Sequence, residues 1–218
     1  LDNYYFHLEL AKNSNQIKGV SQKTGWLYRG IIPLLQEKEA LIDNVHLTRR
    51  ITGLNAVHHN LAYITGIEGL LGLEINERIT LLRTLICELE RVESHLLFLI
   101  SLLHLLRFGR ESNALLKLRM ELKSLYQKLF KNHMLSEINS VGIIQDINQK
   151  DLNQCKTQLL ELLSTINDST SYYLQKKHLI DTCSGVGVLS KEDAPESGVS
   201  GPCLRASNIN LDLRAEDP

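Results

Sequence analysis

The sequence lacks several features that would assign a chemistry at once. Its four cysteines are scattered, and no two of them have the short C-x-x-C spacing of zinc, iron–sulfur or redox-disulfide sites. A phosphate-binding loop, a dinucleotide-binding fingerprint and a nucleophile elbow are also missing from the sequence. The scattered cysteines favour a reducing, cytoplasmic setting for the chain.

Long apolar runs and an excess of charge of one sign are missing too. The 24 basic and 25 acidic residues nearly balance, so the field of the whole molecule does not favour nucleic acid as a partner. The longest apolar stretch, residues 96–106, is interrupted by Ser101 and His104 and falls short of the roughly 20 residues that span a bilayer. We therefore expect no nucleic-acid partner and no membrane span in this chain.

Alternating apolar and polar residues indicate a β-hairpin at the start of the sequence. Tyr4, Phe6, Leu8 and Leu10 alternate with more polar neighbours, which is the pattern of a half-buried strand. A turn-rich segment follows, and a second strand is expected near residues 16–23. Further on, Pro33 suits the first turn of a short helix.

Helical spacing of apolar residues dominates the rest of the chain. It predicts helices over residues 44–71, from Asn76 as N-cap to Gly109, and over residues 115–130 and 154–180. Residues 140–142 are expected to form a loop. After Thr182 the glycines and prolines indicate an ordered, irregular tail, with a capped turn over residues 190–193.

The expected fold class is mainly α, a helical bundle with a small N-terminal β-hairpin or sheet (α+β). We predict a β-rich portion over residues 1–32, the bundle over residues 33–182 and a loop-rich tail packed on it over residues 183–218. Because residue 1 is not Met and the sequence stops without a closing element, we expect one structural unit truncated at both ends.

Two groups of polar residues are candidates for chemistry. His58 and His59 are adjacent on a predicted helix and point to different faces, so they are not expected to hold one metal ion together. Residues 88–95 of the longest helix contain Glu88, Glu90, Arg91, Glu93 and His95. These form either a polar patch inside the bundle, suited to proton transfer, or a solvated helix face, which the pattern alone favours.

Several segments resemble one family in order and spacing. They are Gly25-Trp26-Leu27-Tyr28-Arg29-Gly30-Ile31, residues 71–78 (LGLEINER), residues 88–97 (ELERVESHLL), residues 185–194 (GVGVLSKEDA), residues 198–207 (GVSGPCLRAS) and residues 212–214 (DLR). The chain resembles the quinone-site subunit of respiratory complex I (the D-subunit of NADH:quinone oxidoreductase) and the related [NiFe] hydrogenase large subunits, including the energy-converting, formate hydrogenlyase type. The resemblance is spread over most of residues 25–214 and implies a helical bundle with a small sheet beside it.

The resemblance also implies which site residues are missing. Where hydrogenase members carry their first cysteine pair, this sequence has Thr52 and Asn55, and neutral side chains do not replace thiolates as ligands of nickel and iron. Gly53 stands where complex I members have a quinone-contacting Tyr. Tyr28 and Ile32 replace the family's His and Glu. We therefore expect no metal and no cofactor in this chain, with quinone and NADH bound only in an intact complex.

The function implied by the resemblance is that of one subunit of a larger protein complex. We expect a subunit of a respiratory or hydrogenlyase-type oxidoreductase complex, peripheral to the inner membrane, with an iron–sulfur small subunit and membrane subunits as partners and no catalysis by the isolated chain. The alternatives are a degenerate paralogue that serves as an assembly scaffold, and an unrelated helical adaptor. The candidate residues of the former active-site cleft are Arg29, Arg50, His95 and Arg205.

Overall fold

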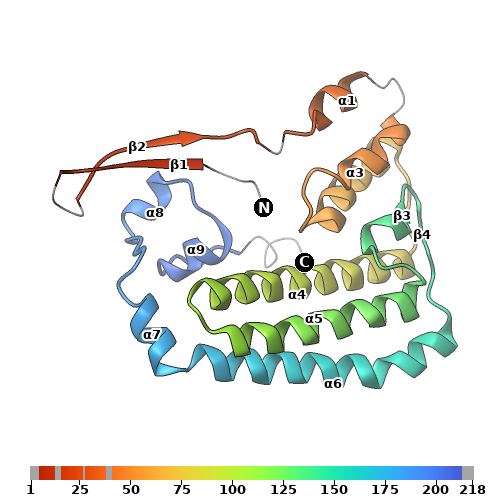
Figure 1. Cartoon of the computed structure of the whole chain (residues 1–218). Coiled ribbons are helices and arrows are strands. Elements are labelled where there is room, and N and C mark those ends of the chain that lie inside the picture. Colours follow the sequence, from red (N-terminus) through yellow and green to blue (C-terminus); the bar gives the residue numbers. More distant parts are fainter. Residues whose placement is uncertain (1–4, 13–15, 27, 38–40, 213–218) are drawn as a thin grey trace. The chain divides into compact units, whose positions relative to one another are not determined.

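The computed structural model describes residues 5–12, 16–26, 28–37 and 41–212 and is mainly helical (Figure 1). The expected fold class, a helical bundle with small β elements, is confirmed. Contact density divides the chain into two compact units, residues 1–170 and residues 171–218. The predicted domain boundaries after residues 32 and 182 remain predictions.

The first unit begins with the predicted hairpin. Strands β1 (Tyr5–Leu10) and β2 (Ile17–Lys23) pair antiparallel, with Leu8 opposite Val20 and Leu10 opposite Ile17. Tyr4, part of the predicted strand, lies outside the described residues. Helix α1 (Ile31–Glu37) follows and contains Pro33 in its first turn, as expected.

The segment predicted as one helix over residues 44–71 consists of three elements. A 3-10 turn η1 (Leu41–Asn44) leads into the short helix α2 (Val45–Thr48), and helix α3 (Ala56–Leu71) begins only after an irregular stretch. The prediction was wrong between residues 49 and 55. The apolar spacing continued across this stretch, although Gly53 and the turn-forming Asn55 interrupt the helix there.

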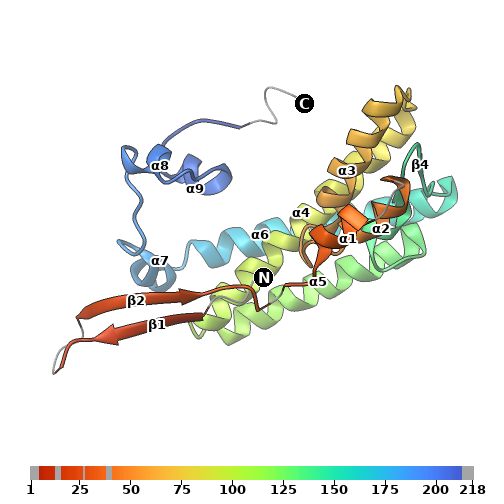
Figure 2. The ribbon, with the colours of Figure 1, turned by 90° about the horizontal axis from the view of Figure 1, so that it is seen from above.

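Two long antiparallel helices form the centre of the first unit. Helix α4 (Glu77–Leu105) begins at the predicted N-cap, where Asn76 Oδ1 accepts a hydrogen bond from Arg78 N at 2.8 Å. Helix α5 (Gly109–Phe130) returns beside it (Figure 2). Gly109, which we expected to end the longest helix, is the first residue of α5. Tyr126, Phe130, Leu96, Leu115 and Leu122 are almost completely buried and fill this core.

A small second hairpin closes the end of the α4–α5 pair. The 3-10 turn η2 (Leu135–Ile138) leads into strands β3 (Asn139–Ser140) and β4 (Ile143–Ile144), so the predicted loop over residues 140–142 is the turn of a hairpin. Gly142 has a φ of 70°, which favours glycine at this turn. Val45, Ile64 and Ile67 form a further core cluster beside Val141.

Helix α6 (Gln149–Leu174) belongs mostly to the first unit and continues into the second. It begins earlier than predicted and ends before residue 176, after which α7 (Lys177–Cys183) starts a new helix. The second unit also contains two short helices, α8 (Asp193–Glu196) and α9 (Gly201–Ala206), where we expected irregular structure. The predicted capped turn is present, because Asp193 N donates to Ser190 Oγ at 3.0 Å.

Candidate functional site

Two of the four predicted site residues are brought together. The Arg29 guanidinium donates from Nη1 to the backbone oxygen of Arg50 at 2.8 Å, and so connects the segment before α1 with the end of α2. Both side chains are exposed. The contact uses only the backbone of Arg50, whose guanidinium does not take part in it.

The other two predicted residues lie on other elements. His95 is exposed on α4. Arg205 lies on α9 in the second unit, where its Nη1 is 3.6 Å from Asp212 Oδ2. The proposed role of all four residues in lining one cleft remains a prediction.

The positions expected to correspond to the first cysteine pair of hydrogenase members, Thr52 and Asn55, form a tight turn before α3. Asn55 N donates to Thr52 Oγ1 at 3.2 Å, so the Thr52 hydroxyl stabilises the turn itself. The neutral Thr52 hydroxyl and the neutral side-chain amide of Asn55 do not fit the soft, anionic ligand set that nickel and iron require. Among the described residues, no three His, Cys, Asp or Glu side chains lie where they could hold a metal ion together.

Glu90 of α4 caps the N-terminus of α3. Its Oε1 accepts a hydrogen bond from Val57 N at 2.8 Å, and its Oε2 accepts one from His58 N at 3.1 Å. The same Oε2 lies 2.6 Å from Nδ1 of His58. Asn55, at the N-cap position, makes no side-chain cap, so a carboxylate from a neighbouring helix satisfies these N–H groups and faces the positive end of the α3 dipole.

Glu93, one turn after Glu90, connects α4 to α5. Its Oε1 lies 2.7 Å from Arg119 Nη2 and 2.9 Å from Lys123 Nζ. The three side chains are partly buried, at 17% exposure for Glu93, 19% for Arg119 and 32% for Lys123. Ion pairs shielded in this way are screened by salt less than fully exposed ones.

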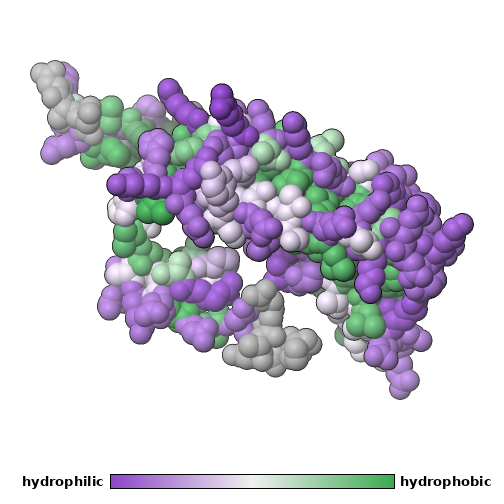
Figure 3. All heavy atoms as spheres, turned by 90° about the horizontal axis from the view of Figure 1, so that it is seen from below, coloured by the Kyte–Doolittle hydropathy of each residue, from purple (hydrophilic) through white to green (hydrophobic). Residues whose placement is uncertain are grey.

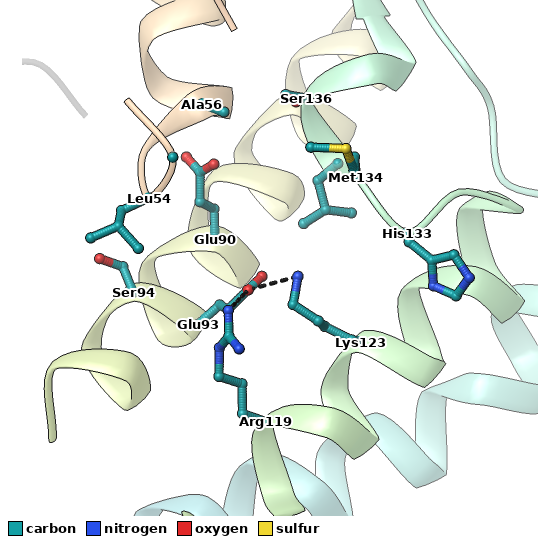
Figure 4. A pocket seen from close by; sticks show the side chains of 12 residues that line it. Leu54, Ala56, Glu90, Glu93, Ser94, Arg119, Lys123, His133, Met134 and Ser136 are labelled. Carbon is teal, nitrogen blue, oxygen red and sulfur yellow. Dashed lines mark hydrogen bonds and ion pairs between the residues drawn. The ribbon is translucent and has the colours of Figure 1, made fainter. Parts of the chain in front are cut away.

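These carboxylates line a pocket with a volume of about 70 Å³ (Figure 4). Its walls come from the turn before α3, from α4, from α5 and from the segment before β3. The lining residues are Gly53, Leu54, Ala56, Glu90, Glu93, Ser94, Arg119, Lys123, His133, Met134, Leu135 and Ser136. Figure 4 shows the Arg119 and Lys123 side chains converging on Glu93 from α5. The pocket therefore borders the turn in which the family's first cysteine pair would stand.

A second, buried polar network joins α3, α4 and the β3–β4 hairpin. Arg83 donates to both carboxylate oxygens of Glu68, at 2.7 and 2.8 Å, and from Nε to Asn139 Oδ1 at 2.9 Å. Gly142 N also donates to Glu68, at 2.7 Å. Burial alone would raise the pKa of Glu68, but the hydrogen bonds from Arg83 and Gly142 and the Arg83 charge lower it overall.

Arg49 extends this network toward the turn before α3. Its Nη2 donates to the backbone oxygen of Asn139 at 2.8 Å. Burial lowers the pKa of Arg49, and the nearby Glu137 charge opposes that effect. From the sequence, Asp43 or a partner subunit was the expected partner of the positive charge at residues 49 and 50. The structure provides one for Arg49 in a strand that lies 90 residues further along the chain.

The polar patch of residues 88–95 is partly buried and partly exposed. Each of its two interpretations, a polar patch inside the bundle and a solvated helix face, therefore holds for some of its residues. Glu90 is buried and Glu93 is partly buried, whereas Glu88 and His95 are exposed. Glu88 Oε1 lies 3.0 Å from Arg91 Nη2, an ion pair at the i, i+3 spacing that brings helical neighbours together. Sequence reasoning missed Arg119 and Lys123, because nothing local marks a charged residue on an amphipathic helix as facing a pocket. It also missed His133, which lies in the loop after α5.

His58 and His59, which we did not expect to share a metal ion, differ in their surroundings. His58 contacts Glu90, as described above, and both imidazoles are partly exposed. Over the described residues, no helix is long and apolar enough to cross a membrane.

Comparison with known proteins shows what the chain is similar to. The family model described as the 49 kDa subunit of respiratory-chain NADH dehydrogenase matches residues 113–218. The NADH-quinone oxidoreductase D-subunit of Geobacter metallireducens is 30% identical over 205 residues, which cover 93% of this chain and 52% of the relative. The D-subunit of Dehalococcoides mccartyi is 31% identical over 218 residues, which cover 98% of this chain and 58% of the relative. The chain thus spans between half and three fifths of the length of these curated relatives.

A solved structure shares the fold. The chain resembles a protein in the structure of the membrane-bound sulfane sulfur reductase, an archaeal respiratory membrane complex, with a TM-score of 0.87 and 24% identity. The match covers 100% of this chain and 61% of the other. At this identity the likeness supports the fold alone.

Proposed function

We propose that the chain is a member of the family of the 49 kDa subunit of respiratory-chain NADH dehydrogenase and that it acts within a membrane-associated oxidoreductase complex. The complex is of the NADH:quinone or hydrogenlyase type. Its partners are an iron–sulfur small subunit and membrane subunits, and this subunit lies at the cytoplasmic face of the membrane. By itself the chain reduces no quinone and evolves no hydrogen.

The apolar face of the first hairpin carries this proposal. The register places Leu8, Leu10, Ile17 and Val20 on one face, and each side chain is more than half exposed. The opposite face contains His7, Ser21 and Lys23. A two-stranded hairpin with an uncovered apolar face is marginally stable in water, so this face is suited to burial in a larger assembly. Figure 3 shows apolar side chains along the hairpin.

The turn before α3 determines what chemistry this subunit contributes. Thr52 and Asn55 do not fit a nickel–iron centre, so we propose that no hydrogen chemistry occurs at this turn. Quinone and NADH are bound only by the intact complex. The Glu90 and Glu93 pocket supplies ionisable groups next to that turn, at the place where the family has its redox site.

Purification of the tagged chain from its native membranes in mild detergent tests the proposal. We expect an iron–sulfur subunit and membrane subunits to co-purify, identified by mass spectrometry and by an iron–sulfur signal in electron paramagnetic resonance. Val20→Lys should reduce the yield of the complex, because it buries a charge in the apolar face. Ser21→Lys, on the opposite face of the same strand, is the matched control. Recovery of the chain without any iron–sulfur partner would contradict the proposal.

The assembly scaffold is the second candidate, favoured because the turn departs from both branches of the family. Thr52 and Asn55 stand where hydrogenase members have thiolates, and Gly53 stands where complex I members have the quinone-contacting Tyr. Activity of the purified complex separates the two functions. NADH-dependent or hydrogen-linked quinone reduction that requires this subunit supports the redox role. If the assembled complex keeps its activity after this subunit is removed from it, the subunit serves only assembly, which supports the scaffold.

A further inference from the structure

The acceptor groups of the α4–α5 pocket are already engaged within the protein. Glu90 accepts two backbone N–H groups at the start of α3 and lies against His58 Nδ1. Glu93 accepts a hydrogen bond from Arg119 and forms an ion pair with Lys123. The negative charge of each carboxylate is therefore balanced locally, Glu90 by the α3 N-terminus and Glu93 by cations.

Some hydrogen-bond donors of the same pocket remain available to a ligand. Arg119 binds Glu93 through Nη2, while its buried Nε has no hydrogen-bond partner among the described residues. The Lys123 ammonium has three donors, and one of them faces Glu93 at 2.9 Å. The exposed His133 lies at the wall of the pocket and can contribute a further donor.

The charges on the α5 side of the pocket also favour an anionic ligand. Arg119 and Lys123 bring two positive charges against the single negative charge of Glu93, and the second carboxylate of the lining, Glu90, faces the N-terminus of α3 instead. The α5 side of the pocket therefore carries one more positive than negative charge. Spare donors combined with positive charge suit an anionic oxygen acceptor, because charge-assisted hydrogen bonds are stronger than neutral ones.

We propose that the pocket between α4 and α5 binds a small oxyanion or carboxylate through Arg119 and Lys123. The hydroxyl groups of Ser94 and Ser136, also in the lining, can donate to the same ligand. A volume of about 70 Å³ holds several waters or one ion of a few heavy atoms, since a single water needs roughly 10–15 Å³ by the same measure. Inorganic phosphate and acetate are of this size. The inference rests on the pocket alone and does not depend on the proposed assembly.

Titration of the purified 218-residue chain with inorganic phosphate tests the inference. The measurement is isothermal calorimetry at low ionic strength, with amide chemical shifts in nuclear magnetic resonance to locate the site. We expect saturable binding at one site, with shifts concentrated at residues 93–94, 119–123 and 133–136. Binding should weaken with added inert salt, because the contacts are electrostatic.

Three variants test the inference, because they are expected to weaken, tighten and leave unchanged the binding of phosphate. Lys123→Met should weaken phosphate binding by about tenfold, the effect of one charge-assisted hydrogen bond. Glu93→Gln should tighten binding several-fold, because it releases both cations and removes a like charge. Lys117→Met, at an exposed lysine of the same helix, should leave binding unchanged.

Folding is checked separately, by circular dichroism and thermal unfolding of each variant. Lys123→Arg serves as a second test, since it retains the charge and should retain most of the binding. The inference is wrong if phosphate does not saturate, if Lys123→Met and Lys117→Met bind equally, or if Glu93→Gln weakens binding while remaining folded.

Discussion

Arg83 and Glu68 form a two-point ion pair inside the protein, with side chains only 5% and 4% exposed. The pair joins α3 to α4, and its remaining hydrogen-bond groups contact Asn139 and Gly142 of the β3–β4 hairpin. A buried pair of this kind is not by itself a source of stability, because desolvation of the two charges offsets their attraction. Removal of one partner, however, leaves an uncompensated charge in the core.

Arg83→Met should therefore destabilise the fold strongly. We expect a loss of about 3–5 kcal/mol in the free energy of unfolding, because Glu68 would remain buried without its partner. Chemical denaturation followed by circular dichroism measures the loss. Arg78→Met, which breaks the exposed pair of Arg78 and Asp146, is the control and should change the free energy of unfolding far less, because water screens exposed ion pairs. Equal effects of the two variants would show that the Glu68 carboxylate has access to water.

Acid should weaken the first unit through Glu68. The pKa of this carboxyl is lowered in the folded chain by Arg83 and Gly142, against the opposing effect of burial. A lowered folded pKa means that the stabilisation is complete above the unfolded value, near 4.5, and is lost as the pH falls through the folded value. Unfolding free energies measured from neutral to strongly acidic pH should fall over this range. Glu68→Gln should flatten that part of the profile, and an unchanged slope would contradict the assignment.

Local sequence signals predicted the elements that depend on local chemistry. Asn76 caps α4 as expected, because an N-cap needs only its own side chain and N–H groups two or three residues further on. The strand alternation around Leu8 and the helix at Pro33 are local in the same sense. The family was also recognisable, from short segments whose order and spacing survive substitution of the site residues.

The candidate site could not be predicted in the same way, since its contacts join distant segments. Glu90 caps a helix that begins far earlier in the chain, at a sequence separation of 33 from Val57. Glu93 pairs with Arg119 at a separation of 26. The spacing of residues 88–95 placed these carboxylates on one helix but could not show which of them face inward. Tertiary packing decides that question, and the sequence pattern favoured the solvated alternative for the whole patch.

Glu90→Gln should loosen the start of α3 without unfolding the chain. The amide retains one acceptor oxygen but loses the charge and directs an N–H₂ group toward donors, so at least one buried N–H loses its partner. We expect a local cost of about 1–3 kcal/mol, seen as faster amide hydrogen exchange at Val57 and His58. Glu88→Gln, at an exposed position of the same helix, should leave that exchange unchanged. If Glu90→Gln exchanged at the original rate, the cap would not stabilise α3.

The four thiols should separate into two reactivity classes. Cys183 and Cys203 are exposed, whereas Cys87 and Cys155 are buried. Burial, together with the charges of Glu90 and Glu88, raises the pKa of Cys87 to about 11, so very little thiolate is present at mildly alkaline pH. A chromogenic disulfide reagent at such a pH should therefore modify two thiols quickly in the folded chain and all four in denaturant. Cys183→Ser and Cys203→Ser should each remove one fast thiol. Fast modification of Cys87 in the folded chain would mean that α4 opens at this position, and with it the helix that carries both carboxylates of the pocket.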